Sequence, residues 1–148
     1  MKMKHIILSA FTVLLCISCG KNQKSATDDA QQPDSAIVTR VEMLASQLPK
    51  EYGAFSMEKC TYDGKTVILI LRAQTDDPQM TNPEMLKWLP SMMLNDLHLL
   101  DTMMIKRLVE LNQPLTYEIY EKKGIQPVKK FALTPQKMKG RAEYMKMF

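Results

Sequence analysis

The segment of residues 66–71, with the sequence TVILIL, constrains the possible folds more than any other part of the chain. Its β-branched and aliphatic side chains lack polar alternation, which is typical of a central strand buried on both faces. Asp63-Gly64 just before it favours a tight turn, and residues 54–62 favour a strand on the other side of that turn. The fold is therefore expected to contain a sheet built around this hairpin.

A second hairpin is predicted nearer the C-terminus. Residues 115–121 alternate between apolar and polar side chains, as a strand with one buried face does. Residues 128–133 form the last expected strand, and Lys122-Lys123-Gly124 supplies the turn between the two.

A helix is expected before the first hairpin and another after the second. Residues 37–48 place apolar side chains at three- and four-residue spacing, with Ser35 as the expected cap and Pro49 as the stop. Residues 135–144 favour a short terminal helix.

The segment between the hairpins, residues 83–112, also has helical periodicity. Asn82 is placed to cap its start, and Pro90 predicts a kink or a short break near Leu89. Asp101 could cap a second helix, so the pattern leaves open whether this segment is one helix or two.

Together these elements predict a single α+β domain over residues 36–148. A helix followed by a hairpin occurs twice, in residues 37–73 and 84–133. Two such αββ units can join their hairpins into a four-stranded antiparallel sheet with the helices packed on one face.

The first residues of the chain have the pattern of an export signal. A basic segment that includes Lys2 and Lys4 precedes an uncharged apolar stretch that is too short to span a bilayer, so residues 1–18 are expected to be a signal peptide. The end of this stretch, LCISCG, resembles the lipobox of bacterial lipoproteins, although Cys16 stands where that family prefers leucine. The resemblance implies cleavage before Cys19 and a lipid on that cysteine.

Residues 19–35 are expected to be a flexible tether between the lipid and the domain. From Gly20 onward they are small and polar, and they would span about 20 Å as a coil or roughly 50 Å when extended. By resemblance to the enterobacterial sorting rule, Gly20 is not an inner-membrane retention signal, which favours the outer membrane and a domain that faces the periplasm. Surface-export signals of lipoproteins resemble acidic runs directly after the cysteine, whereas Asp28 and Asp29 lie late in the tether. The leaflet that holds the lipid and the side that the domain faces therefore stay open.

Charge and cysteine content exclude some classes of protein. The formal net charge of +4 is spread along the chain, without the basic stripe and stacking aromatics of a nucleic-acid binder. Of the three cysteines, Cys16 leaves with the signal and Cys19 carries the lipid. Cys60 then has no partner for an intramolecular disulfide, and its strand-like surroundings favour a buried, inert thiol.

No catalytic residue and no cofactor is assigned. The chain lacks the nucleophile-elbow, zinc-protease, phosphate-loop and dinucleotide motifs. His98 lies among leucines within a helix, which favours a packed or half-exposed residue over a catalytic base. Asp76, Asp77 and Glu84 are interpreted as solvated loop residues rather than as a catalytic carboxylate pair. The expectation is that the protein is not an enzyme.

The abundant methionines raise the alternative of a copper-binding protein, because thioethers suit Cu(I). Met93 and Met104 share a helical face with leucines, however, and this favours a core stripe. Met145 and Met147 have a spacing seen in copper sites but no clustered histidine, so no metal ligand is assigned.

The predicted layout resembles the αββ repeats of PepSY and β-lactamase-inhibitor-like envelope proteins. The helix ending in Leu-Pro and the segments YDGK at 62–65, LTYEIY at 115–120 and FALTP at 131–135 are similar to those of a broad set of small exported bacterial proteins. The resemblance implies an exported αββ lipoprotein and, since that set has no established activity, no site residues.

The function expected from these observations is that of a binding or interaction module, held to a membrane by its lipid and acting on an envelope protein or ligand not identified by the sequence. The uncovered face of the sheet would be its surface, with contributions from the following residues: Tyr62, Ile68, Ile70, Thr116 and Tyr120. A contiguous exposed apolar face would favour this reading. A deep pocket lined by Asp76, Asp77 or His98 would favour the second alternative, an envelope enzyme.

Overall fold

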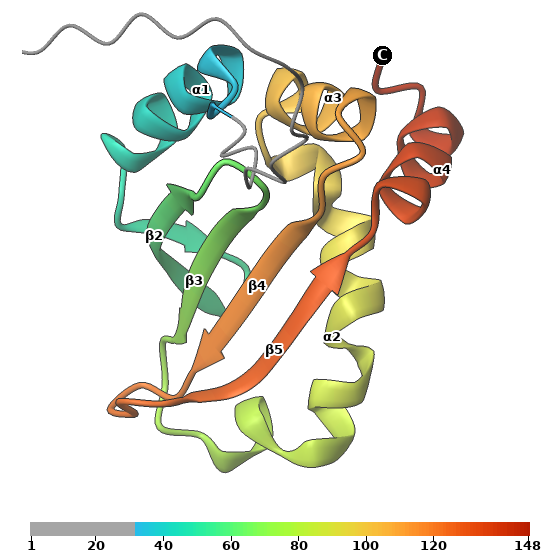
Figure 1. Ribbon diagram of the computed structural model, residues 1–148. Helices are drawn as coiled ribbons and strands as arrows, with labels where there is room; N and C mark the ends of the chain where they lie inside the picture. The colour runs from blue at the N-terminus through green and yellow to red at the C-terminus, as the bar shows by residue number, and fades with distance from the viewer. Residues whose placement is uncertain (1–31) are drawn as a thin grey trace, which may run out of the picture. The chain divides into compact units, whose positions relative to one another are not determined.

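One mixed sheet forms the centre of the computed structural model, which describes residues 32–148 (Figure 1). Its strands are β1 (Lys50–Tyr52), β2 (Phe55–Tyr62), β3 (Val67–Ala73), β4 (Leu115–Tyr120) and β5 (Pro127–Leu133), and they lie side by side in that order. The expected signal peptide, Cys19 and most of the expected tether lie outside the described residues.

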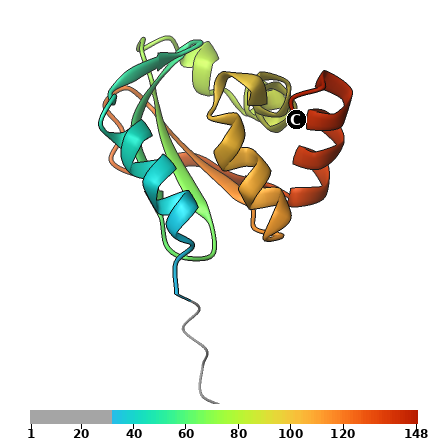
Figure 2. The same ribbon diagram turned by 90° about the horizontal axis from the view of Figure 1, so that it is seen from above.

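The helices are α1 (Ser35–Ala45), α2 (Pro83–Asn95), α3 (Thr102–Glu110) and α4 (Pro135–Met145), with short 3₁₀ turns η1 (Pro78–Thr81) and η2 (Asp96–Leu99). α3 packs against both α1 and α4, so that these three helices follow one another across the molecule (Figure 2). α2 packs against β5 and α4. Within residues 32–148, no helix is both long enough and apolar enough to cross a membrane.

The core lies between the helices and one face of the sheet. On β3 and β4 every second side chain is buried, namely Val67, Leu69, Leu71 and Ala73 and then Leu115, Tyr117 and Ile119. The remaining side chains of both strands are only half-buried. The expectation of helices on one face is confirmed, whereas the expectation that residues 66–71 are buried on both faces is not, because no layer covers the second face within the described residues.

The α+β class and both predicted hairpins are confirmed, but the sheet is not four-stranded and antiparallel. β3 and β4 pair in parallel, from Val67 opposite Leu115 to Arg72 opposite Tyr120. The reason is the path of α2, η2 and α3, which carries the chain back along the sheet (Figure 1). β4 consequently begins beside the start of β3 and runs in the same direction, as a helical crossover requires.

The strand β1 was not expected. It has only three residues, between Pro49 and Gly53, and so it is too short to show an alternating pattern. Gly53 has a φ of 60°, a left-handed conformation that suits glycine and lets the chain reverse from β1 into β2.

Residues 83–112 form two helices, α2 and α3, which are joined by η2. This settles the choice between one helix and two that the sequence left open. As expected, Asp101 caps the second, and its Oδ1 accepts a hydrogen bond from the Met104 amide at 2.8 Å. Of the two alternatives predicted near Leu89, a kink or a short break, the break is wrong, since α2 runs through Pro90 as one helix. Leu86 and Leu89 of that helix are buried in the core, and this packing holds it across the proline.

The domain begins slightly earlier than expected. Asp34, not Ser35, is the N-cap of α1, and its Oδ1 accepts hydrogen bonds from the amides of Ala36 and Ile37, both at 3.1 Å. An aspartate caps as well as a serine and here also pairs with Arg107. The end of the expected tether at residue 35 is therefore already part of the folded domain.

Candidate functional site

A cleft of about 460 Å³ opens where β3 and β4 end. Because these strands are parallel, their carboxyl ends meet at one edge of the sheet, which is a frequent place for ligand sites in folds with parallel strands. The segment after β3 forms one wall with Asp76 and Asp77, and the turn after β4 forms the other with Glu121, Lys122 and Lys123.

One wall is acidic, with Asp76 and Asp77, and the other carries two lysines, Lys122 and Lys123, beside Glu121. Lys123 Nζ lies 3.1 Å from Asp76 Oδ2, so an ion pair crosses the cleft. Both side chains are largely exposed, and solvent screens such a pair strongly. The pair can therefore separate at little cost when a ligand offers its own charges.

Arg72 holds the wall of the β4–β5 turn in place. Its Nη1 donates to the backbone carbonyls of Glu121 at 2.9 Å and Gly124 at 2.8 Å, and its Nε donates to both carboxylate oxygens of Glu58. The guanidinium also lies over the Tyr120 ring, 5.2 Å from its centroid. Sequence reasoning missed Arg72, although one charged residue directly after the apolar run of residues 66–71 was a visible signal.

The opposite wall is fixed by side chains that bond to its own backbone. Asp77 caps η1 by accepting a hydrogen bond from the Gln79 amide at 2.9 Å, and Asn82 caps α2 by accepting one from the Met85 amide at 2.8 Å. Both walls of the cleft are thus built by hydrogen bonds before any ligand arrives.

The volume of the cleft is within the range of about 300–1,000 Å³ that is usual for small-molecule sites. Its charged walls suit a polar ligand that has both a positively and a negatively charged group. Within the part of the chain that the structure describes, no group of three or more histidine, cysteine, aspartate or glutamate side chains could hold a metal ion.

The structure brings together some of the polar residues singled out from the sequence and not others. Asp76 and Asp77 both line the cleft. Glu84 is exposed on α2 and pairs with Lys87. His98 is exposed on η2 with its Nδ1 3.2 Å from the Asn95 carbonyl, and it does not line the cleft.

The sulfur-containing residues of the described part of the chain are divided between the core and the surface. Cys60 is buried, and burial raises the pKa of its thiol to about 12, so that almost no thiolate forms at neutral pH. Met93 and Met104 are buried among leucines, as the core-stripe interpretation expects. Met145 and Met147 are half-buried in and after α4.

The uncovered sheet face is not a contiguous apolar surface. Ile68 and Ile70 are only half-buried, but a charged pair lies in the same row as Ile70, with Lys130 Nζ 2.7 Å from Glu118 Oε1. The Tyr120 hydroxyl donates to Glu118 at 3.0 Å. The hydrogen bond from Lys130 holds the pKa of Glu118 below its usual range.

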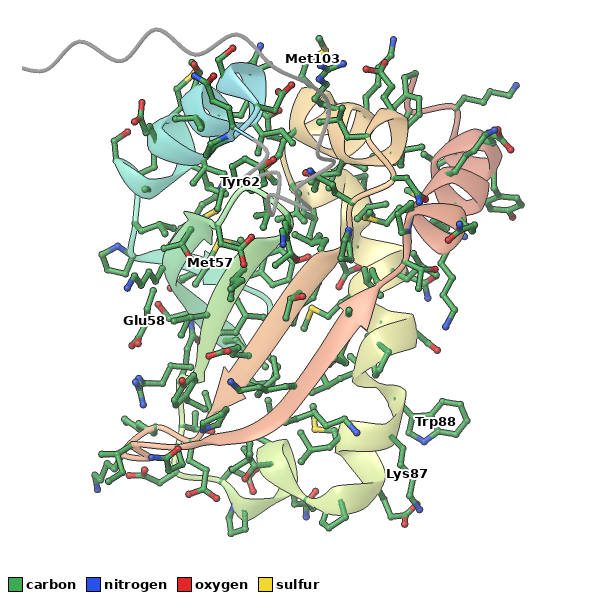
Figure 3. All side chains as sticks on the ribbon, in the orientation of Figure 1. Met57, Glu58, Tyr62, Lys87, Trp88 and Met103 are labelled. Atoms are coloured by element: carbon green, nitrogen blue, oxygen red, sulfur yellow. The ribbon has the colours of Figure 1, made fainter. Side chains whose placement is uncertain are left out.

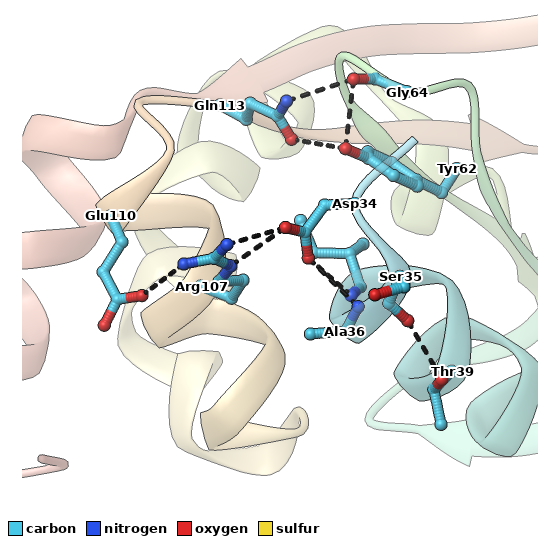
Figure 4. A network of polar contacts seen from close by, with 10 residues as sticks. Asp34, Ser35, Ala36, Thr39, Tyr62, Gly64, Arg107, Glu110 and Gln113 are labelled. Carbon is cyan, nitrogen blue, oxygen red and sulfur yellow. Dashed lines mark hydrogen bonds and ion pairs between the residues drawn. The ribbon is translucent and has the colours of Figure 1, made fainter. Parts of the chain in front are cut away.

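Tyr62 does not belong to that face. A β-bulge between Met57 and Lys59 shifts the alternation of β2, so that Tyr62 pairs with Val67 and packs against the core. Its hydroxyl hydrogen-bonds with the Gly64 carbonyl at 3.0 Å and with Gln113 Oε1 at 2.8 Å (Figure 4).

A second polar cluster joins α1 to α3. Arg107 donates to Asp34 at 2.7 Å and to Glu110 at 3.1 Å (Figure 4). The hydrogen bond from Arg107 holds the pKa of Asp34 below its usual range. The first residues of the folded domain are thereby tied to α3.

Comparisons with known proteins bear on the fold alone. No protein family and no curated protein matches the sequence. The fold is similar to the crystal structure of a Pseudomonas aeruginosa protein that is inferred to be secreted, with a TM-score of 0.53 and 18% identity over 69% of this chain and 88% of that one. The observed fold thus has a solved structural neighbour, while no match supports the resemblance to PepSY proteins.

Proposed function

We propose that this protein is an exported, lipid-anchored binding module that holds a small zwitterionic ligand, such as an amino acid or a dipeptide, in the cleft at the ends of β3 and β4. The observation that carries the proposal is a cleft with two acids, Asp76 and Asp77, on one wall and two lysines, Lys122 and Lys123, beside Glu121 on the other, with Asp76 paired to Lys123 across it. Acidic side chains would receive the ligand's ammonium group, and the lysines its carboxylate.

The state of the cleft supports binding rather than catalysis. Asp77 already caps η1, and Asp76 pairs with Lys123. Asp77 thus holds the backbone of η1, and Asp76 balances the charge of Lys123. His98 does not line the cleft and so cannot act there as a base.

Export and anchoring rest on the sequence. The basic and apolar start of the chain and the lipobox-like segment before Cys19 support a lipoprotein, and Gly20 supports the outer membrane with the domain facing the periplasm. The structural neighbour that is inferred to be secreted agrees with export. The αββ resemblance to PepSY-type envelope proteins is kept as part of this proposal.

The ligand proposal is tested by calorimetric titration of the protein with a panel of amino acids and dipeptides. We expect saturable binding of at least one zwitterion and at least a tenfold loss of affinity in the double variant Lys122→Gln and Lys123→Gln. Lys137→Gln, at an exposed position of α4, is the matched control. Absence of binding across the panel, or an equal loss in the control, would contradict the proposal.

The anchor is tested by metabolic labelling with a palmitate analogue in a bacterial host. We expect label on the wild type and none on Cys19→Ala. Equal labelling of the two proteins would refute lipidation at this cysteine.

A further inference from the structure

A second, smaller cleft of about 270 Å³ lies between α1 and α3. It is lined by Ala36, Arg40, Met103, Lys106, Arg107 and Glu110. It lies next to the point where the chain enters the domain, since Asp34 caps α1 and pairs with Arg107 of α3. Any tether that precedes Asp34 is therefore attached at this cleft.

The basic groups of this cleft are held in place but still face solvent. Arg40 pairs with Asp101 at 3.5 Å, and Arg107 pairs with Asp34 and Glu110. The side chains of Arg40 and Arg107 nevertheless keep 37% and 39% exposure. Lys106 is exposed and forms no ion pair with any of residues 32–148. Asp34, Asp101 and Glu110 thus balance the three cations in charge, and Lys106 alone has no acidic partner among the described residues. Its ammonium and the exposed edges of the two guanidinium groups can still donate to a phosphate group.

Exposed apolar side chains stand beside these cations. Met103 is 56% exposed and Phe148 is 50% exposed, and Lys106 Nζ lies 6.0 Å from the centre of the Phe148 ring. Basic groups next to protruding apolar groups are typical of surfaces that rest in the headgroup region of a bilayer.

The length of the preceding segment supports the same surface. If Cys19 carries a lipid, only residues 20–33 separate it from Asp34, and a chain of that length reaches at most roughly 50 Å. A domain of this size has a radius of gyration of roughly 13 Å. The lipid would therefore keep the α1–α3 cleft close to the bilayer and raise its effective concentration there.

We propose that the α1–α3 cleft, flanked by Met103 and Phe148, docks on the headgroups of anionic phospholipids in the membrane that carries the anchor. This inference rests on the lipid anchor of the proposed function. The ligand cleft after β3 and β4 lies at the other end of the strands from α1 and α3 (Figure 1). Docking would consequently turn the ligand cleft away from the membrane and toward solvent.

The test uses the single tryptophan of the chain as an internal reference. Trp88 is 68% exposed on α2, and it lies far from Met103, near the opposite end of the molecule (Figure 3). The lipidated protein is reconstituted in vesicles of phosphatidylglycerol and phosphatidylcholine with brominated acyl chains, which quench a tryptophan that reaches the bilayer. The native protein is compared with a reporter that combines Met103→Trp and Trp88→Phe.

We expect at least threefold stronger quenching of the reporter at position 103 than of the native Trp88. Adding Lys106→Glu to the reporter should halve that quenching, as should vesicles of phosphatidylcholine alone. Lys87→Glu, an equal charge change on α2, should leave it unchanged. Equal quenching at both positions, stronger quenching of Trp88, or no effect of Lys106→Glu would overturn the proposal.

A second arm separates failure of docking from failure of the anchor. The Cys19→Ala form of the reporter is added to the same vesicles at high lipid concentration. Quenching that depends on phosphatidylglycerol and is lost with Lys106→Glu supports the docking surface even where the palmitate test has refuted the anchor. Absence of quenching both in this arm and in the lipidated protein overturns the docking surface. Whether Cys19 carries a lipid is then decided by the palmitate labelling alone.

Discussion

The two faces of the sheet differ in how they are stabilised, although the same strands form both. On the face toward the helices, Leu69 of β3 has no exposed surface. On the other face its neighbour Ile70 is only half-buried and shares a row with the pair of Glu118 and Lys130. Apolar burial therefore dominates the stability of the first face, and polar pairs over partly covered aliphatic groups organise the second.

The two faces also differ in their contacts with the cleft after β3 and β4. On the second face Arg72 lies over the Tyr120 ring and donates hydrogen bonds to the β4–β5 turn. It thereby fixes one wall of the cleft after β3 and β4. Changes on the helix-covered face should affect stability, whereas changes on the other face should affect the cleft with a smaller loss of stability.

The largest effect is expected for Leu69→Ala. Leu69 lies in the middle of β3 with no exposed surface, so truncation should lower the free energy of unfolding by about 2–5 kcal/mol. Urea unfolding followed by circular dichroism measures the change. A loss of under 1 kcal/mol would show that the core is loosely packed at this point.

Gln113→Leu should have the next largest effect. The buried Gln113 amide donates to the Gly64 carbonyl at 3.1 Å and accepts from the Tyr62 hydroxyl. Its loss removes these partners and should cost about 1–3 kcal/mol in the same unfolding measurement. Gln136→Leu, the same change at an exposed position of α4, is the control. Equal losses in the two variants would contradict the explanation.

Ile70→Ala should cost less than Leu69→Ala, about 1 kcal/mol, because Ile70 is already partly exposed in the native state. The two variants remove side chains of equal size from adjacent positions of one strand. Equal losses in urea unfolding would mean that something covers the second face in solution, such as another copy of the chain.

The smallest effect is expected for Glu118→Gln, and it should depend on pH. Because the pKa of Glu118 is lowered in the folded state by Lys130, the carboxylate contributes stability above its usual pKa and loses that contribution as pH falls through the lowered value. The wild type should therefore exceed Glu118→Gln in urea midpoint at pH 7 and lose this advantage between about pH 5 and pH 2. A pH-independent difference would show that packing, not charge, is responsible.

Local signals predicted much of the fold. Asp63-Gly64 marked the turn between β2 and β3, where Asp63 Oδ1 accepts hydrogen bonds from the amides of Lys65 and Thr66. Asp101 was recognised as a cap, and Leu115 to Tyr120 showed which side chains of β4 are buried. These features depend on residues close together in the chain, so a short window of sequence contains their cause.

The candidate site could be predicted only in part. Asp76 and Asp77 were noticed as a carboxylate pair in a loop, but their facing partners Lys122 and Lys123 were assigned only to a turn. The two segments are more than forty residues apart in the chain, and nothing local indicates that they form one cleft. Arg72 was missed because its contacts with Glu121 and Gly124 exist only when β3 and β4 are neighbours.

By itself the sequence determined the α+β class, the two hairpins and the apolar run at the centre of the sheet, because propensity, alternation and turn chemistry act over a few residues. Only the tertiary structure decided that β3 and β4 are parallel, since that depends on how far α2, η2 and α3 carry the chain before β4 begins. The bulge in β2 likewise decided the face of Tyr62, because one extra residue reverses the alternation beyond it. The candidate cleft follows from the parallel pair, because only that arrangement brings the ends of both strands to one edge.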